Sequence, residues 1–358
     1  MSGMGGWIDV SRRWKKRPAG SNWGDFGEDD QIGRLNLLTP EKVLQAVQEV
    51  QSGRTFCLSL PLDYPGGNRM NENRYPPILR PCLRHGGVNF NYVYAERDPL
   101  SKDVLSDDLA ILHLQYSTHW DGLCHVGALF DVNDDGEPIP VYYNGYKANV
   151  DVVGPESTDE CGISGAITPK NTSYAHALGI ENMAATRVQG RGVMIDLRRH
   201  FGDARTVVGF DALMGVMEAD GIAVEPGDML CIHTGLADLI LGMQKNPDPN
   251  VILSSCAVLD GKDEALQDWI TTSGIAVIVS DNYAVEDFPA TLPNPCSSML
   301  PLHNLCLFKL GIHLGELWQL TPLAEWLYAQ GRYRFMLTAP PLRLPGAVAS
   351  PMTPVATV

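Results

Sequence analysis

The stretch DMLCIHT, residues 228–234, is an apolar run with the length of one buried strand. Outward from it, residues 192–197 and 275–280 have the same character and predict two more strands. Between these runs, residues 210–219 and 264–272 predict helices. Because strands that alternate with helices are typical of an α/β arrangement, the central part of the chain predicts an α/β fold.

The C-terminal part continues this pattern. Three more elements are predicted there: helices at 301–310 and 321–330 and a strand at 334–339. The tail 340–358 carries five prolines and little charge, so we expect it to pack along the body or against another subunit. With no internal repeat and no long linker, the chain is interpreted as one domain over 23–358, preceded by an N-terminal extension over 1–22.

Two kinds of segment are predicted before the central part. Thr39 is a plausible N-cap, and the proline that follows it suits the first helical position, so we expect a helix that begins there and stops at Gly53. Residues 55–60 predict a strand. Residues 64–88 are rich in Pro, Gly, Asn and Arg without periodicity, which predicts an ordered loop or a substrate-access segment.

Composition excludes several classes of protein. Lys and Arg number 27 against 42 Asp and Glu, so the formal net charge is −15 and a phosphate backbone would be repelled. No apolar run reaches the roughly 18 residues of a membrane span, and the N-terminus lacks the apolar centre of a secretory signal. The eight cysteines form no Cys-x-x-Cys pair. We therefore expect a cytoplasmic protein with a small-molecule substrate and neither nucleic acid nor membrane as partner.

The segment STHWDGLCH, residues 117–125, carries the strongest chemical signal. Residues 110–119 predict a strand, and if the extended backbone continues, three polar side chains share one face: Gln115, His119 and Asp121. Imidazole and carboxylate groups two residues apart can reach one cation. His125 follows a turn at Gly122 and is a candidate ligand or proton carrier.

A lone His-x-Asp pair is a weak signal, and two polar residues at a strand end would explain it. Here, five polar residues fall within thirteen positions that are otherwise dominated by apolar types: His113, Gln115, His119, Asp121 and His125. Buried polar groups without partners cost about 1–3 kcal/mol each, so a metal or a dense hydrogen-bond network must compensate them. We favour the metal.

The chain resembles the cyclase family, which includes bacterial kynurenine formamidases, isatin hydrolases and a trans-dienelactone hydrolase. Residues 117–125 resemble the centre of its His-x-Gly-Thr-His-x-Asp-x-Pro-x-His signature. The resemblance extends from about Trp23 to the end of the chain, through DQIGRLNLLTP (30–40), PGD (226–228), IHTG (232–235), SDN (280–282), PLH (301–303), GELW (315–318) and APPL (339–342).

The resemblance implies roles for individual residues. His119, Asp121 and His303 are implied as metal ligands, and His125 as the histidine that moves protons. Glu316 is implied as a second-metal ligand or an acid/base group. Relatives imply a single α/β domain with a mixed, partly barrel-like sheet flanked by helices, of the swivelling β/β/α type, and assembly as a homodimer or homotetramer.

Gln115 departs from the signature, because it stands where the family has its first histidine. Its amide oxygen can bind a metal but is neutral and weaker than imidazole, so one metal per subunit is the better expectation. Nitrogen and oxygen ligands without thiolates suit Zn²⁺, and Mn²⁺ is equally admissible.

Five further residues are candidates for substrate contact. Trp120, Tyr142 and Tyr143 concentrate aromatic rings beside the signature and are interpreted as a pocket wall, with core packing as the alternative. His85 is either a loop residue or a substrate contact. Glu286 is either a loop carboxylate or a site residue.

These features predict a metal-dependent hydrolase of the amidase or lactonase type. Its substrate would be a cyclic amide, a lactone or an aryl formamide, cleaved at a carbonyl C–N or C–O bond by a metal-activated water. The alternatives are a metal-dependent cyclase or lyase, and a family member whose metal is structural.

Overall fold

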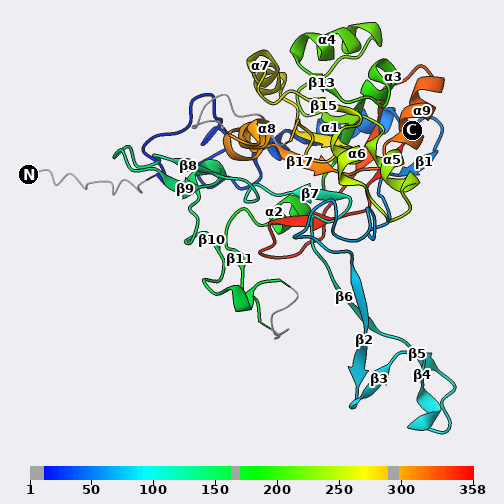
Figure 1. Cartoon of the computed structure of the whole chain (residues 1–358). Coiled ribbons are helices and arrows are strands. Elements are labelled where there is room, and N and C mark those ends of the chain that lie inside the picture. Colours follow the sequence, from blue (N-terminus) through cyan, green and yellow to red (C-terminus); the bar gives the residue numbers. More distant parts are fainter. Residues whose placement is uncertain (1–11, 163–169, 289–297) are drawn as a thin grey trace, which may run out of the picture.

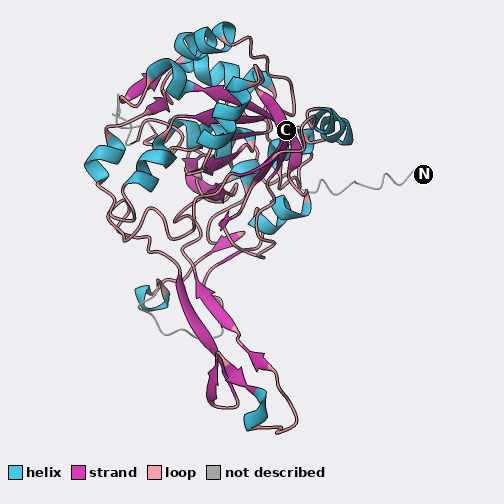
Figure 2. Cartoon of the chain, turned by 90° about the vertical axis from the view of Figure 1, so that its right-hand side faces the viewer, coloured by secondary structure: helices cyan, strands magenta, loops and turns pink. Residues whose placement is uncertain are grey.

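The protein consists of a body and a long arm that projects from it (Figures 1 and 2). The computed structural model describes residues 12–162, 170–288 and 298–358. Of the expected N-terminal extension, the described part packs on the body, because Trp14 is buried and its ring lies 5.8 Å from that of Trp23. In the described residues, no helix has the length and apolar character needed to cross a membrane.

A nine-stranded mixed sheet forms the centre of the body. Its strands, in spatial order, are β1 (Thr55–Cys57), β20 (Val355–Thr357), β18 (Arg334–Thr338), β12 (Gln189–Asp196), β14 (Met229–His233), β16 (Val277–Ser280), β17 (His313–Glu316), β7 (His119–Asp121) and β19 (Ala349–Pro351). The four strands from β12 to β17 are parallel, and the strands on either side of them are antiparallel. The sheet curls, and helices flank it (Figure 2). The predicted mixed, partly barrel-like sheet is confirmed.

Helices cover both faces of this sheet, which explains the continuous apolar character of its central strands. In β14, Leu230 and Ile232 pack into a core that includes Leu213 of α4 (Phe210–Ala219). Met229 and Cys231, on the other face, pack into a core that includes Leu323 of α9 (Thr321–Ala329). The helices are α1 (Pro40–Gln48), α2 (Ile180–Ala185), α3 (Leu197–Phe201), α4 (Phe210–Ala219), α5 (Leu236–Gly242), α6 (Pro249–Leu253), α7 (Glu264–Ser273), α8 (Pro301–His303), which continues as a π-helix (Asn304–Leu310), and α9 (Thr321–Ala329).

Most predicted elements of the central and C-terminal parts are confirmed within one to three residues. Helix α4 has the predicted bounds, and α1 begins where expected, with the Thr39 side chain accepting a hydrogen bond from the Lys42 amide at 3.4 Å. Its predicted end at Gly53 is wrong, because the helix stops at Gln48. The tail packs along the body as expected, with β19 beside β7 and β20 between β1 and β18.

Two predictions fail where the chain enters and leaves the arm. The expected strand at 110–119 is two strands, β6 (Asp108–Ile111) and β7, with turns between them. The expected loop at 64–88 contains β2 (Ile78–Arg84), which pairs with β6 and with β3 (Gly87–Asn89) to form the arm. Leu79 and Leu83 of β2 are exposed, so these strands lack the alternation that burial of one face imposes.

Short strand pairs complete the structure. The pair β4 (Tyr92–Val93) and β5 (Val104–Leu105) lies at the end of the arm (Figure 1). On the body lie β8 (Ala128–Phe130) with β9 (Ile139–Val141), β10 (Val152–Val153) with β11 (Tyr174–Ala175), and β13 (Thr206–Val208) with β15 (Ala257–Leu259).

Candidate metal centre

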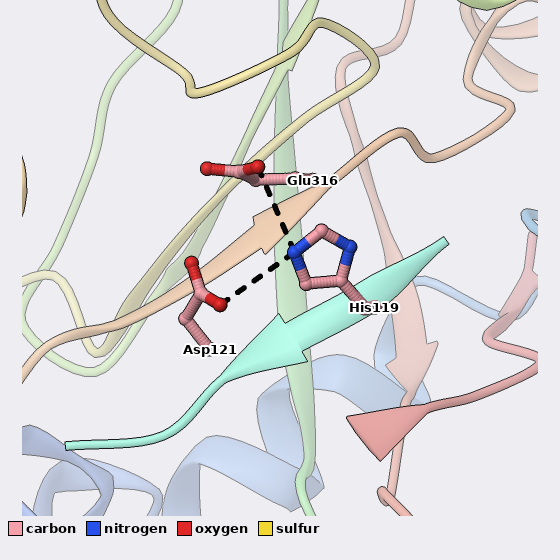
Figure 3. Close-up of side chains that lie close together, drawn as sticks. All are labelled: His119, Asp121 and Glu316. Carbon is pink, nitrogen blue, oxygen red and sulfur yellow. Dashed lines mark ion pairs between the residues drawn. The ribbon is translucent and has the colours of Figure 1, made fainter. Parts of the chain in front are cut away.

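The register between β7 and β17 gathers three polar side chains on one face of the sheet. The two strands are antiparallel and pair His119 with Glu316. Residues directly opposite each other share a face, and so do residues two apart on one strand. Asp121 therefore joins His119 and Glu316 (Figure 3).

The geometry of these three groups fits a cation. His119 Nε2 lies 3.5 Å from Asp121 Oδ1 and 3.6 Å from Glu316 Oε2, and one ligand atom from each residue lies within 4.8 Å of the other two. All three side chains are buried. Among the residues that the structure describes, none provides a hydrogen-bond partner for His119 Nε2, Asp121 Oδ2 or Glu316 Oε1. Buried polar atoms are normally satisfied, so a divalent cation between them would supply the missing partner.

His303 faces the same point from helix α8. Its Nε2 lies 3.2 Å from Glu316 Oε1 and 3.7 Å from Asp121 Oδ2. Its Nδ1 is 2.8 Å from Glu286 Oε1, and Glu286 also accepts hydrogen bonds from the backbone amides of Leu302 and His303. Glu286 thus holds the ring with Nε2 turned towards the three-residue group, the usual arrangement for a histidine that binds a metal.

Gly261 makes room for this carboxylate. A Cβ atom at position 261 would lie 2.2 Å from Glu286 Oε2, closer than real Cβ contacts come. From the sequence, Glu286 is either a loop carboxylate or a site residue. The structure places it behind His303, buried and away from solvent.

His125 lies beside the group and nearest to the surface. Its Nε2 is 3.7 Å from Asp121 Oδ1, and its side chain is 25% exposed, against 1% for His119 and Asp121. Together with Leu129, Pro140 and Tyr142 it lines an open groove with a volume of about 230 Å³. A molecule in this groove can reach His125.

Gln115 contacts the group as a hydrogen-bond donor. Its Nε2 donates to Asp121 Oδ1 at 2.5 Å, so the amide nitrogen, and not the oxygen considered as a metal ligand, faces the carboxylate. Gln115 and His125 therefore both approach the same oxygen, Asp121 Oδ1.

Known proteins resemble this chain in sequence and in fold. The family model described as "Putative cyclase" matches residues 58–287. A crystal structure of a novel cyclase is 30% identical with a TM-score of 0.70, and the match covers 94% of this chain and 97% of that one. The chain belongs to the cyclase family. No curated protein matches this cyclase.

More distant solved structures share the fold. Isatin hydrolase A from Labrenzia aggregata bound to benzyl benzoate has a TM-score of 0.52 at 15% identity, covering 88% of this chain and 98% of that one. An isatin hydrolase bound to the product analogue thioisatinate has a TM-score of 0.50 at 13% identity, covering 89% and 99%. At these identities the likeness supports the fold of the cyclase alone.

The electrostatics of the cyclase site also suit a cation. Burial opposes a charged ring at His303, but Glu286, Glu316 and Asp121 outweigh it and raise its pKa to about 10. In the same way, burial opposes protonation of His119, yet Asp121 and Glu316 raise its pKa. The pKa of Asp121 stays low despite burial, because three imidazoles surround it. The carboxylates therefore favour positive charge at this point, and a bound divalent cation would supply that charge in place of protons on the rings.

Other predicted contacts lie elsewhere in the cyclase. Trp120 points to the opposite face of β7, where its ring lies 5.1 Å from that of Trp318 and its Nε1 donates to the Ala339 carbonyl. Tyr143 is fully buried in the core, and His85 lies on the arm beside Arg97. Of the three aromatic candidates, the structure brings only Tyr142 to the groove beside His125.

Replacement of Glu286 by alanine is expected to weaken metal binding by the cyclase about 10- to 100-fold, the usual effect of removing the group that orients a metal-binding histidine. Competition against a chromogenic chelator measures this affinity. Asp287→Ala is the matched control, because that carboxylate pairs with Arg205 and lies outside the cluster. An unchanged affinity in Glu286→Ala would show that His303 does not bind the metal.

Proposed function

We propose that this cyclase-family protein is a metal-dependent hydrolase that cleaves the carbonyl C–N or C–O bond of a cyclic amide, a lactone or an aryl formamide. The observation that carries the proposal is a set of buried atoms on His119, Asp121 and Glu316 that find no hydrogen-bond partner in the described parts of the chain, next to a histidine that reaches an open groove. Structural ion clusters are usually closed on all sides, whereas catalytic metal sites keep an approach for substrate.

We further propose that His119, Asp121, His303 and Glu316 hold one Zn²⁺ or Mn²⁺ per subunit. When bound, the cation supplies Lewis-acid polarisation of the carbonyl and lowers the pKa of a water molecule. Gln115 is neutral and turns its amide nitrogen, which cannot bind a metal, towards Asp121, so it does not support a second metal site. One metal is consistent with that arrangement.

His125 would move the proton in this reaction. The attacking water loses a proton to His125 Nε2 as its oxygen bonds to the carbonyl carbon. The same proton then passes to the departing nitrogen or oxygen as the C–N or C–O bond breaks. Asp121 Oδ1, 3.7 Å from His125 Nε2, stabilises the imidazolium between the two steps. The products are a carboxylate and an amine or alcohol.

A metal and substrate test decides between this function and its alternatives. Protein purified without added metal is expected to contain one divalent cation per chain, and to convert at least one of isatin, phthalide and formanilide to a carboxylate. Chelation should abolish the conversion, and Zn²⁺ or Mn²⁺ should restore it. A reaction that needs metal but forms no carboxylate would indicate a cyclase or lyase. A fully occupied metal site with activity that is indifferent to chelation would indicate a structural metal.

The homodimer or homotetramer and the cytoplasmic location stay predictions. Light scattering of the purified protein would determine the oligomeric state.

A further inference from the structure

The arm concentrates exposed apolar side chains away from the body. It extends over residues 78–111, from the start of β2 to the end of β6, and Figures 1 and 2 show it projecting into solvent. Eight of the 22 large apolar side chains that are exposed in the described parts of the chain lie in these 34 residues. Soluble monomers rarely gather so many in one place, and such a patch usually marks an interaction site.

The register of the arm strands places five apolar residues on one face. Leu83 of β2 lies opposite Val88 of β3, and Leu79 lies opposite Ala110 of β6. Residues opposite each other share a face, and so do residues two apart on one strand, so Pro81 joins these four. All five are exposed, with Leu79 at 68%, Leu83 at 80% and Val88 at 60%. This set is the apolar arm face.

The opposite face of the arm is covered in part by the arm itself. Asn89 is buried there, where it accepts a hydrogen bond from Arg84 Nε at 2.7 Å and donates to Asp107. The Arg84 guanidinium lies 5.9 Å from the centre of the Tyr92 ring. Because a ribbon of short strands is only marginally stable in water by itself, a surface that packs on the apolar arm face would stabilise the arm.

The distribution of charge favours a second arm as that surface. The arm has four Lys and Arg against five Asp and Glu, so it carries −1 of the net charge of −15. The remaining −14 lies on the rest of the chain, and two copies would repel each other there. In a two-fold contact the same patch of both copies meets, so like charges within it would repel. The one charged residue that β2, β3 and β6 place on this side is Asp108, opposite Pro81.

The arm is also large enough for a stable contact. A standard interface involves about 20–30 residues of each partner, and the arm has 34 residues. Exposed apolar side chains continue along it at Phe90, Val93, Leu100 and Val104. Two sheets that pack face to face bury the apolar side chains between them. A second arm therefore matches the apolar arm face in shape and in polarity.

We propose that the apolar arm face packs on the same face of a second copy of this chain, related by two-fold symmetry. The paired arms then form a subunit interface and keep the acidic bodies apart. This inference is independent of the hydrolytic function, and it assigns a specific contact to the expected homo-oligomer.

Light scattering of the full chain tests the contact with charged variants. Leu79→Glu/Leu83→Glu and Leu79→Arg/Leu83→Arg each bring like charges together across the two-fold contact. Leu44→Glu/Val47→Glu is the matched control, because these side chains are 64% and 49% exposed on α1 of the body. Thermal unfolding establishes that each variant is folded.

The wild type is expected to be an oligomer, and each arm variant alone should have half its mass. Like-charge repulsion should raise the dissociation constant of the arm contact by at least about 100-fold. An equimolar mixture of the Glu and Arg arm variants should regain the wild-type mass, because opposite charges then meet. The body control should keep the wild-type mass.

Four results would overturn the inference. A monomeric wild type would exclude a second copy as the partner of the arm. Arm variants that keep the wild-type mass would exclude the apolar arm face from the contact. A mixture that stays at half the mass would show that the arm does not pack on another arm. Equal dissociation of the body control would remove the assignment to the arm. Mass needs no turnover, so a failure of the proposed hydrolytic function leaves these outcomes unchanged.

Discussion

Replacement of Asp121 by asparagine is expected to abolish both metal binding and hydrolysis. Asp121 is the carboxylate that the other members of the cluster share: its oxygens lie 3.5 Å from His119, 3.7 Å from His125 and 3.7 Å from His303. Asparagine keeps the shape and removes the negative charge. A metal stabilises the transition state by several kcal/mol, and about 1.4 kcal/mol corresponds to a tenfold change in rate. We therefore expect the rate of hydrolysis to fall by at least about 10³-fold.

Metal analysis and steady-state kinetics on the same preparation measure this effect. Asp211→Asn, on the exposed side of α4, is the control. Thermal unfolding establishes that the variant folds, since the change leaves the surrounding imidazoles without their counter-charge. A folded Asp121→Asn enzyme that keeps its metal and most of its activity would refute the assignment of the centre.

The second large effect concerns His125. Replacement by alanine is expected to lower kcat by about 10²- to 10⁴-fold, the usual contribution of a positioned general acid and base. Metal content should stay at the wild-type level, because His125 lies on the groove side of Asp121 and outside the group of three ligand atoms that fits a cation.

Kinetics and metal content together separate the two roles considered for this histidine. His176→Ala is the control, because His176 is exposed and stacks on Tyr174. Parallel loss of metal and activity in His125→Ala would make the residue a ligand, and an unchanged kcat would remove it from the reaction.

Local patterns in the sequence predicted the body of the fold well. The strands β12, β14 and β16 are visible as continuous apolar runs because both of their faces are buried, and the helices α4 and α7 between them are visible by the period of their one buried face. The same reasoning placed His119 and Asp121 on one face of β7, since residues two apart on a strand share a side.

The arm was missed for the corresponding reason. Strands β2 and β6 pair with each other away from the body, and apolar residues such as Leu79 and Leu83 remain exposed on them. Without a buried face, no alternation marks the strands, and the prolines and glycines nearby predict a loop instead.

The composition of the site depends on contacts that no local pattern records. Glu316 joins His119 because β17 pairs antiparallel with β7 in one register, and a shift by one residue would turn it to the opposite face. Glu286 orients His303, which lies 17 residues further along the chain. Arg74, before the arm, contacts Gln115, after it. The pattern of apolar and polar residues within single segments therefore sufficed to predict the α/β class and the His119–Asp121 pair. Burial acts on each segment separately, so it marks the local sequence. The rest of the cluster required the packed fold, because pairing register and the meeting of distant loops depend on the whole chain.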